Sequence, residues 1–289
     1  MTTTVYFNDR YTASVHAAEP TRKSGLIAAT LEGHPEVRLA DPAAHREQAL
    51  VHLAEVHDAR YLEAIRTGDP FELAESQGFA WDPGIYTMAV EHAAGQVAAV
   101  NEVLTTGARI AGSLSSGQHH ARRDEGVGYC TFNGLAASTR EAFRLGAERV
   151  LVLDFDAHGG GGTRSVTDPE RVIQVDVTVS PFDLWEPTST DDHFELVEAD
   201  DYLAAIDRAL NHASGIGDVD LVIYNAGMDP INAEVGANQL AERERRVAEW
   251  AAAAEVPLAY LLAGGYLWGG FDWDDIVALH RLTIDTFVS

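Results

Sequence analysis

Short apolar runs alternate with longer segments of mixed apolar and polar residues along most of the chain. The later runs lack the inside–outside alternation of a strand with one face in water, which is typical of parallel strands covered on both sides. We predict six strands, which are Val5–Phe7, Arg109–Ser113, Val150–Phe155, Val172–Val177, Leu221–Asn225 and Leu258–Ala263.

The segments between these runs have the pattern of amphipathic helices. They predict helices at Tyr86–Thr105, Gly134–Leu145, Ala199–His212, Gln239–Ala253 and Trp273–Phe287. Strands that alternate with helices indicate an α/β fold with a central, mostly parallel sheet flanked by helices. Since no internal repeat or linker interrupts the pattern, we expect a single domain over residues 1–289. Roughly the first eighty residues are irregular and are placed only loosely.

Four predicted strands are followed by segments rich in acidic, histidine, tyrosine and glycine residues. The segments are GQHHARRDEGVGYC (117–130), DFDAHGGGG (154–162), NAGMDP (225–230) and AGGYLWGG (263–270). In an open parallel sheet, ligands bind in the crevice beyond the carboxyl ends of the strands. Because four such ends converge here, we expect a functional site at this edge of the sheet.

Two carboxylates and one imidazole in these segments form a candidate metal site. Asp156 and His158 are two residues apart, so in extended backbone their side chains point to the same side. Asp229 can reach the same point from another strand end. Three such ligands with a fourth position left for water are the arrangement of a hydrolytic zinc site. A hydrogen-bonded turn without metal is the alternative for an Asp-x-His pair at a strand end.

The adjacent histidines His119 and His120 are candidate catalytic groups. On a helix they would diverge, so only an irregular loop lets both face one cleft. One ring would take a proton from water, and the other would stabilise charge or protonate the leaving amine. Asp154 is placed to accept a bond from an Nδ1–H and fix the tautomer of that ring. The alternative is a pair of exposed loop histidines.

Tyr266 is a third candidate, because a tyrosine hydroxyl beside a metal can polarise a carbonyl and stabilise the resulting oxyanion. Gly264 and Gly265 precede it and would let the backbone come close to the metal or the substrate. An ordinary tyrosine at the rim of a cleft is the alternative.

The composition limits where and on what the protein acts. No apolar run reaches the ~18 residues of a membrane span, and MTTTVYFNDR lacks the features of a signal peptide. Cys130 is the single cysteine, which excludes an internal disulfide and a thiolate-rich zinc site and favours the cytoplasm. The net charge of −25 argues against nucleic acid and anionic membranes as partners. The oligomeric state stays open, and a homo-oligomer is compatible with the sequence.

Together the motifs resemble those of the histone deacetylase superfamily, including its bacterial acetylpolyamine amidohydrolases and deacetylase-like members. The resemblance covers most of the chain in the same order, and the tandem-histidine motif is its most specific part. The segments that carry it are VHAAEPTRKSGL, VHDARYLEAI, WDPGIYTMAVEHAAG, SGQHHARRDEGVGYCTFNG, LDFDAHGGGGT, NAGMDP and LAGGY. It implies an arginase/deacetylase-like sheet with the site at the carboxyl ends of the strands.

The resemblance also implies a role for each candidate residue. Zn²⁺ would be held by Asp156, His158 and Asp229, ligands that also suit Fe²⁺ or Co²⁺. The paired catalytic residues would be His119 and His120, with Tyr266 as carbonyl activator. The substrate channel would be lined by Gly128 and Tyr129, with Phe182 and Trp185 in the opposing wall. A structural K⁺ would touch the loop that carries Asp154, Asp156 and His158.

Two positions depart from the family pattern Asp-x-Asp-x-His-His-Gly-Asn/Asp-Gly-Thr. Gly159 stands in place of the second histidine of this segment, and Gly161 in place of the Asn/Asp. The residue at position 161 normally supports the second tandem histidine. We therefore expect His120 to be less well oriented and less basic, with reduced or redirected activity, or with added space for an unusual substrate.

The leading hypothesis is a zinc-dependent deacetylase or amidohydrolase that cleaves an N-acyl amide. Its substrate would be a small acylated amine, such as an acetylpolyamine, or an acyl-lysine peptide. A non-catalytic metal-binding relative is the alternative that Gly159 and Gly161 suggest. A ureohydrolase is a third reading, but it needs Ser-x-Asp-x-Asp at a second strand end, where NAGMDP offers one carboxylate.

Overall fold

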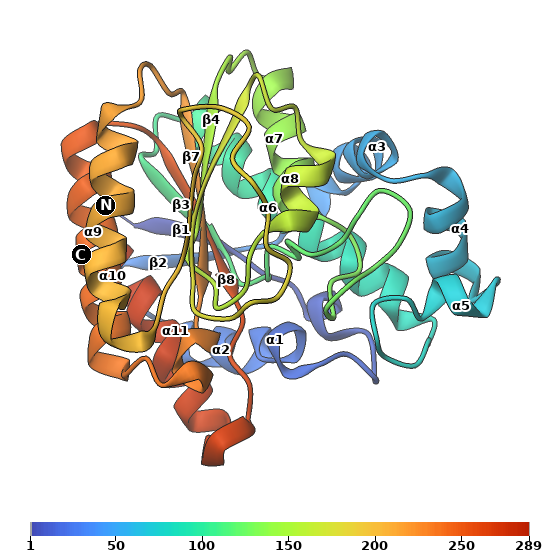
Figure 1. Cartoon of the computed structure of the whole chain (residues 1–289). Helices are drawn as coiled ribbons and strands as arrows, with labels where there is room; N and C mark the ends of the chain where they lie inside the picture. The colour runs from blue at the N-terminus through green and yellow to red at the C-terminus, as the bar shows by residue number, and fades with distance from the viewer. Residues whose placement is uncertain (1, 289) are drawn as a thin grey trace.

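Eight parallel strands form one sheet at the centre of the protein (Figure 1). The computed structural model describes residues 2–288. The order across the sheet is β2-β1-β3-β8-β7-β4-β5-β6. The strands are β1 (Thr3–Tyr6), β2 (Val37–Ala40), β3 (Ile110–Ser113), β4 (Val150–Asp154), β5 (Val172–Thr178), β6 (His193–Leu196), β7 (Leu221–Gly227) and β8 (Leu258–Ala263). The six predicted strands are confirmed to within two residues, and every pairing is parallel.

The five predicted helices are also present. They are α6 (Gly84–Thr105), α7 (Gly134–Arg144), α9 (Tyr202–Gly215), α10 (Ala237–Ala254) and α11 (Trp273–Val288). The segment Ala199–Asp201, predicted as the start of a helix, is a separate 3₁₀ turn before α9. The region expected to be irregular contains α1 (Glu19–Arg22), α2 (Ser24–Leu31), α3 (Arg46–Val56), α4 (Ala59–Thr67) and α5 (Phe71–Ala74), and the short α8 (Gly161–Val166) follows β4.

Helices cover both faces of the sheet. On one face α9, α10 and α11 pack against alternate strand residues such as Leu151 and Leu153 (Figure 1). On the other face α6 and α7 pack against the intervening residues, such as Val150 and Val152. Burial on both faces explains why the strands are continuous apolar runs.

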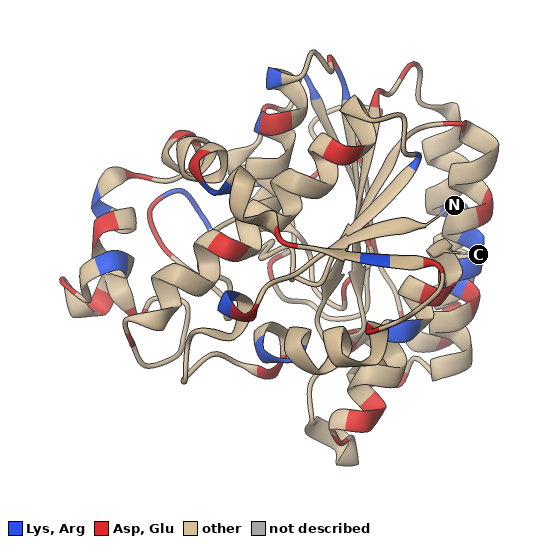
Figure 2. Cartoon of the chain, turned by 180° about the vertical axis from the view of Figure 1, so that it is seen from behind, with Lys and Arg blue, Asp and Glu red and all other residues tan. Residues whose placement is uncertain are grey.

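The charged side chains lie mainly on the helices and loops, whereas the central strands carry few (Figure 2). Many arginines of this acidic protein are paired with carboxylates along one helix face, as in the contacts of Arg245 with Glu242 and Glu249 on α10. Between residues 2 and 288, no helix is both long and apolar enough to cross a bilayer.

Five neighbouring strands, β3, β8, β7, β4 and β5, end at the same edge of the sheet. Each is followed by a loop that carries candidate functional residues. The topology therefore brings together segments that are far apart in the sequence, as expected for a doubly covered parallel sheet.

Candidate active site

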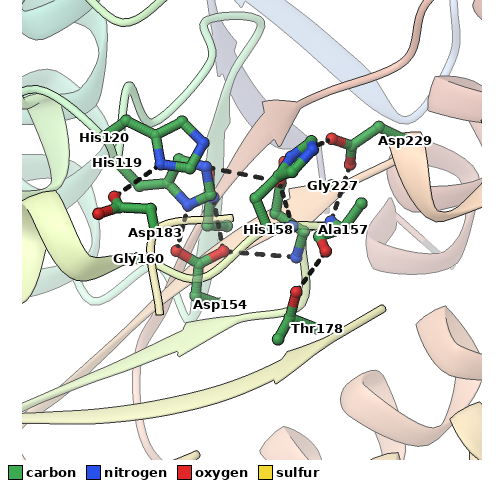
Figure 3. A network of polar contacts seen from close by, with 12 residues as sticks. His119, His120, Asp154, Ala157, His158, Gly160, Thr178, Asp183, Gly227 and Asp229 are labelled. Atoms are coloured by element: carbon green, nitrogen blue, oxygen red, sulfur yellow. Dashed lines mark hydrogen bonds and ion pairs between the residues drawn. The ribbon is translucent and has the colours of Figure 1, made fainter. Parts of the chain in front are cut away.

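The three predicted metal ligands lie together at this edge. One ligand atom each of Asp156, His158 and Asp229 lies within 4.8 Å of the others. His158 Nδ1 is 3.1 Å from Asp156 Oδ1 and 3.1 Å from Asp229 Oδ2. Figure 3 shows the imidazole directed toward the carboxylate of Asp229. Both carboxylates are buried.

Backbone contacts hold the two carboxylates in place. The amide of His158 donates to Asp156 Oδ1 at 3.1 Å, and the amide of Ala157 donates to Asp229 Oδ1 at 3.0 Å. Gly264, with φ of +61°, lies so close that a Cβ atom there would be 2.4 Å from Asp229 Oδ1. The glycine is therefore required both by its backbone conformation and by its distance from a ligand.

The donor set fits a divalent cation. Asp229 Oδ2 is buried and has no hydrogen-bond partner among the described residues, because its contact with His158 has ion-pair distance but not hydrogen-bond geometry. Burial alone would lower the pKa of His158, but the carboxylates of Asp156 and Asp229 raise it to about 11. The two carboxylates therefore stabilise a positive charge on the imidazole between them. A metal cation bound to all three side chains would supply that positive charge instead of the proton. Two oxygens and one imidazole nitrogen are ligands that Zn²⁺, Fe²⁺ and Co²⁺ accept.

His119 has the carboxylate partner that the sequence predicts. Its Nδ1 lies 2.7 Å from Asp154 Oδ2 (Figure 3). Its Nε2 lies 3.4 Å from Asp156 Oδ1. Asp154 is fixed in turn by Asn225, whose Nδ2 donates to Oδ1 at 2.8 Å. Burial favours the neutral ring, but Asp154 and Asp156 raise the pKa of His119 to about 10. A cation between the ligands would offset part of that carboxylate charge.

His120 also has a carboxylate partner although position 161 is a glycine, so the expectation that this ring is less well oriented is wrong. Its Nδ1 lies 2.8 Å from Oδ2 of Asp183, which comes from the loop after β5 (Figure 3). Burial and the neighbouring charge of His119 lower the pKa of His120 to about 4, although the bond to Asp183 acts in the opposite direction. The ring is therefore neutral near neutral pH. With Nδ1–H donated to the carboxylate, Nε2 keeps a lone pair that can accept a proton.

Asp183 was missed in the sequence because it lies 63 positions from His120. In the stretch SPFDLWEP, the family resemblance points only to Phe182 and Trp185, as a channel wall. One signal in the sequence could have indicated Asp183. It is an acidic residue between Phe182 and Trp185, in a chain that has a glycine at position 161 where the family pattern has Asn or Asp.

The tandem histidines lie in an irregular loop, as expected. We call residues 117–133 the histidine loop. Its backbone is braced by His57, which donates from Nδ1 to Arg122 O at 2.7 Å and accepts at Nε2 from Asn133 N at 2.9 Å. Asn133 Nδ2 donates to Ala121 O at 3.0 Å. These buried bonds replace the regular backbone pairing that the loop lacks.

A cavity of about 500 Å³ leads from the surface to this site. Apart from two histidines, its walls contain no ionisable side chain other than tyrosine among the described residues. It is lined by Ser76, Gln77, Gly78, His120, Val127, Gly128, Tyr129, His158, Phe182, Tyr266 and Trp268. Gly128, Tyr129 and Phe182 thus lie where the resemblance implied a channel.

Two residues expected beside the substrate lie elsewhere. Trp185 does not line the cavity; it is buried behind the wall, where its indole N–H donates to Asp176 Oδ2 at 2.6 Å. Gly265 lies against His280, and a Cβ atom at this position would be 3.2 Å from Nε2 of that ring. Since an indole needs an acceptor when buried, the carboxylate of Asp176 explains the inward position of Trp185.

Tyr266 lies in the wall of the cavity, and burial together with the charges of Asp229 and Asp156 raises the pKa of its hydroxyl. The hydroxyl is therefore protonated and available as a donor. Its ring stacks on Trp268 with 4.5 Å between centroids. Asn232, which the sequence did not single out, accepts from Tyr266 N at 3.3 Å and donates to Trp268 O at 3.1 Å, and so fixes this segment.

Comparisons with known proteins relate the chain to one family. The histone deacetylase domain matches residues 16–187. Histone deacetylase 2 of Arabidopsis thaliana is 31% identical over 169 residues, which cover 54% of this chain and 44% of that protein. Histone deacetylase-like amidohydrolase of Pseudomonas aeruginosa is 35% identical over 161 residues, which cover 53% of this chain and 41% of that protein. The alignments thus span less than half of the length of these two relatives.

An uncharacterized protein of Picosynechococcus matches over more of its length. It is 29% identical over 230 residues, which cover 73% of this chain and 74% of that protein. Among solved structures, the HD domain of HDA15 has a TM-score of 0.78 at 20% identity and covers 100% of this chain and 90% of that one. At this identity the structural likeness shows the fold.

Proposed function

Because this chain belongs to the histone deacetylase domain family, we propose that it hydrolyses an N-acyl amide to an amine and a carboxylate. The proposal also includes Zn²⁺ as the cation of Asp156, His158 and Asp229. One observation carries it: the ligand cluster, the two imidazoles with carboxylate partners and a tyrosine line one narrow pocket, which shares His120, His158 and Tyr266 with the wider cavity.

A cation held by these ligands supplies Lewis acidity, which polarises an acyl oxygen and lowers the pKa of water. Every other part of the proposed mechanism is a task for this chain's own side chains. His120 takes a proton from water at Nε2 and returns it to the amine nitrogen as the C–N bond breaks. The neutral state of the ring and its position in the cavity wall support this role.

His119 lies deeper and contacts the ligand Asp156, so we assign it the stabilisation of charge that develops beside the ligands. Tyr266 donates its hydroxyl proton in a hydrogen bond to the acyl oxygen, a role suited to a tyrosine that burial keeps protonated. Both assignments use groups that are held in place before substrate binds, which lowers the cost of reorganisation in the transition state.

The walls of the cavity support an extended, apolar stem next to the amide. Tyr129 and Phe182 are partly exposed at its sides, at 38% and 42%. Such walls suit the alkyl chain of an acyl-lysine peptide or of an acylated polyamine.

The net charge of −25 favours cationic small molecules over polyanions. The single cysteine supports a cytoplasmic location.

We also propose that a monovalent cation, K⁺, binds next to the loop that carries Asp154, Asp156 and His158. Asp176 is buried near Asp154, and burial together with that neighbouring charge raises its pKa well above the ordinary value. Its Oδ1 has no hydrogen-bond partner within the described part of the chain. A cation at this point would offset the negative charge of Asp154 and Asp176, and Asp154 is the partner of His119.

The test is an assay of the purified chain loaded separately with Zn²⁺, Fe²⁺ or Co²⁺. Acetyl-lysine peptides and acetylpolyamines are the substrates, and release of acetate is the measurement. We expect turnover that requires metal and falls about 10²–10³-fold in Tyr266→Phe, the loss typical of one oxyanion donor. Turnover that survives both Tyr266→Phe and His119→Ala would remove this mechanism.

Counting bound metal separates the remaining alternatives. One divalent ion per chain with turnover supports the amide hydrolase. Two divalent ions per chain would favour a ureohydrolase, although the loop after β7 offers a single carboxylate, Asp229, to this cluster. Bound metal without turnover of any amide would favour a binding protein.

A further inference from the structure

The loop that follows β5 occupies the space left by two glycines. We call residues 180–185 the wall loop, since Phe182 lines the cavity. Gly159 N donates to Phe182 O at 2.9 Å, and Gly161 N donates to Asp183 O at 3.1 Å. A Cβ atom at Gly159 would lie 2.5 Å from Asp183 O, and one at Gly161 would lie 2.6 Å from Asp183 Oδ1. A side chain at either position would therefore displace the wall loop.

The carboxylate of Asp183 is held from three directions. Its Oδ2 accepts from His120 Nδ1 at 2.8 Å and from Gly162 N at 3.0 Å. Its Oδ1 pairs with the guanidinium of Arg122, which also donates to Gly161 O at 3.4 Å. The side chain is only 2% exposed. A buried carboxylate with this set of donors is ionised and fixed in orientation.

The backbone at Asp183 adds a second sign of a specific role. Its φ of +55° lies in the left-handed region, which residues other than glycine adopt rarely. Such conformations persist where the surroundings over-determine them, often at functional sites. Here the conformation turns the carboxylate inward toward His120, while the preceding Phe182 faces the cavity.

We propose that Asp183 is the positioning residue of His120, supplied by the wall loop in place of the residue that position 161 lacks. Gly159 and Gly161 provide the space for it. The inference rests on the proposed function for its consequence in catalysis, but the contact itself is independent of that function. Asp183 keeps Nδ1 protonated and Nε2 free, and it stabilises the imidazolium while the proton is in transit from water to the amine.

The wall and the support of the histidine are then parts of one segment. The ring of Phe182 lies edge-on to that of His120, with 4.9 Å between centroids. Movement of the wall loop would therefore change both the width of the cavity and the orientation of the imidazole. A positioning residue on a rigid element would lack this coupling.

The first experiment compares Asp183→Ala and Asp183→Asn with the zinc-loaded wild type. Loss of a carboxylate that orients a functional imidazole costs ~10–100-fold. We expect Asp183→Ala to lower kcat by that factor with KM and bound zinc nearly unchanged. Asp183→Asn should lose less, because its amide oxygen still accepts from Nδ1–H. Glu186→Gln, a change of charge at the exposed residue directly after the wall loop, is the matched control and should leave kcat unchanged.

A second variant pair tests the exchange of positions. Asp183→Gly removes the carboxylate and tolerates the positive φ. Adding Gly161→Asp returns a carboxylate to the space that the Asp183 side chain leaves, because a Cβ atom at position 161 would lie 2.6 Å from Asp183 Oδ1. We expect the double variant to recover part of the kcat that Asp183→Gly loses. An equally low kcat in both variants, with both folded and zinc-bound, would contradict the exchange.

A readout that does not need activity separates this inference from the proposed function. The NMR spectrum of protein labelled with ¹⁵N-histidine reports which ring nitrogen of His120 carries the proton. We expect the Nδ1–H form in the wild type and its loss in Asp183→Ala. The same spectrum in both proteins, or an unchanged kcat in Asp183→Ala, would overturn the inference. A wild type that turns over no amide but shows the Nδ1–H form would overturn the function alone.

Discussion

Two buried histidines with lowered pKa values should each make the folded state less stable in acid. His57 illustrates the reason. Burial lowers its pKa from 6.5 to about 4. Its Nε2 accepts from the backbone amide of Asn133, so protonation would place two donors face to face and leave a buried charge. His92 is similar: its pKa is also lowered by burial to about 4, and its Nδ1 has no partner among residues 2–288.

The sign and size follow from proton linkage. Because the folded state has the lower pKa, the unfolded chain binds more protons as the pH falls through 6.5, and the free energy of unfolding decreases. At about pH 5 a pKa of about 4 against 6.5 corresponds to a loss of about 2 kcal/mol. His57 and His92 together would lose about 4 kcal/mol, a large part of the ~5–15 kcal/mol typical of a domain.

Urea unfolding followed by tryptophan fluorescence measures this effect. Wild type and His57→Gln are compared at about pH 7.5 and about pH 5. The variant is expected to be less stable at the higher pH, because it loses a bond that braces the histidine loop. Its stability should depend less on pH, by about 2 kcal/mol between the two conditions.

Replacement of an exposed histidine, His16→Gln, is the control, and it should keep the pH dependence of the wild type. Paired carboxylates also contribute to acid unfolding, but they are common to all three proteins. Parallel curves for the wild type and His57→Gln would refute the reasoning, because His57 would then titrate alike in the folded and unfolded chains.

Three further predictions concern the site. Asp229→Asn should abolish the rise in melting temperature that Zn²⁺ gives the wild type, as measured by thermal unfolding with and without metal. Gly128→Ala should lower kcat/KM by roughly tenfold, mainly through kcat, measured by steady-state kinetics, because a Cβ atom there would lie 2.7 Å from the His120 ring and displace it. Asn232→Ala should lower kcat roughly tenfold at unchanged zinc content, measured by kinetics and metal analysis, because Tyr266 loses the side chain that fixes its segment.

The sequence predicted the interior of the fold better than its margins. The central strands are buried on both faces, so they appear as apolar runs. The two missed strands, β2 and β6, lie at the edges of the sheet, where Arg38 and Glu195 interrupt the apolar pattern. The N-terminal helices were missed because they are short, and α3 shows little separation of apolar and polar faces.

At the site, the sequence predicted residues whose partners lie in recognisable motifs at strand ends. Asp154 ends the buried strand β4 and Asp156 follows it, and their position alone indicated a site. Partners in the wall loop were harder to predict. Trp185 and Asp183 are two residues apart, yet one is buried against Asp176 and the other contacts His120. The positive φ of Asp183 makes the two side chains point in different directions, and this backbone angle cannot be predicted from a single sequence.

The wall loop both lines the cavity and supplies the carboxylate that contacts His120, and this limits how the protein can be redesigned. Grafting a foreign segment between Ser180 and Trp185 to admit a bulkier ligand would also remove the acid that steadies His120. Libraries that keep Asp183 and the paired glycines fixed, and diversify Phe182 and Leu184, should therefore yield more functional variants than libraries that exchange the whole segment.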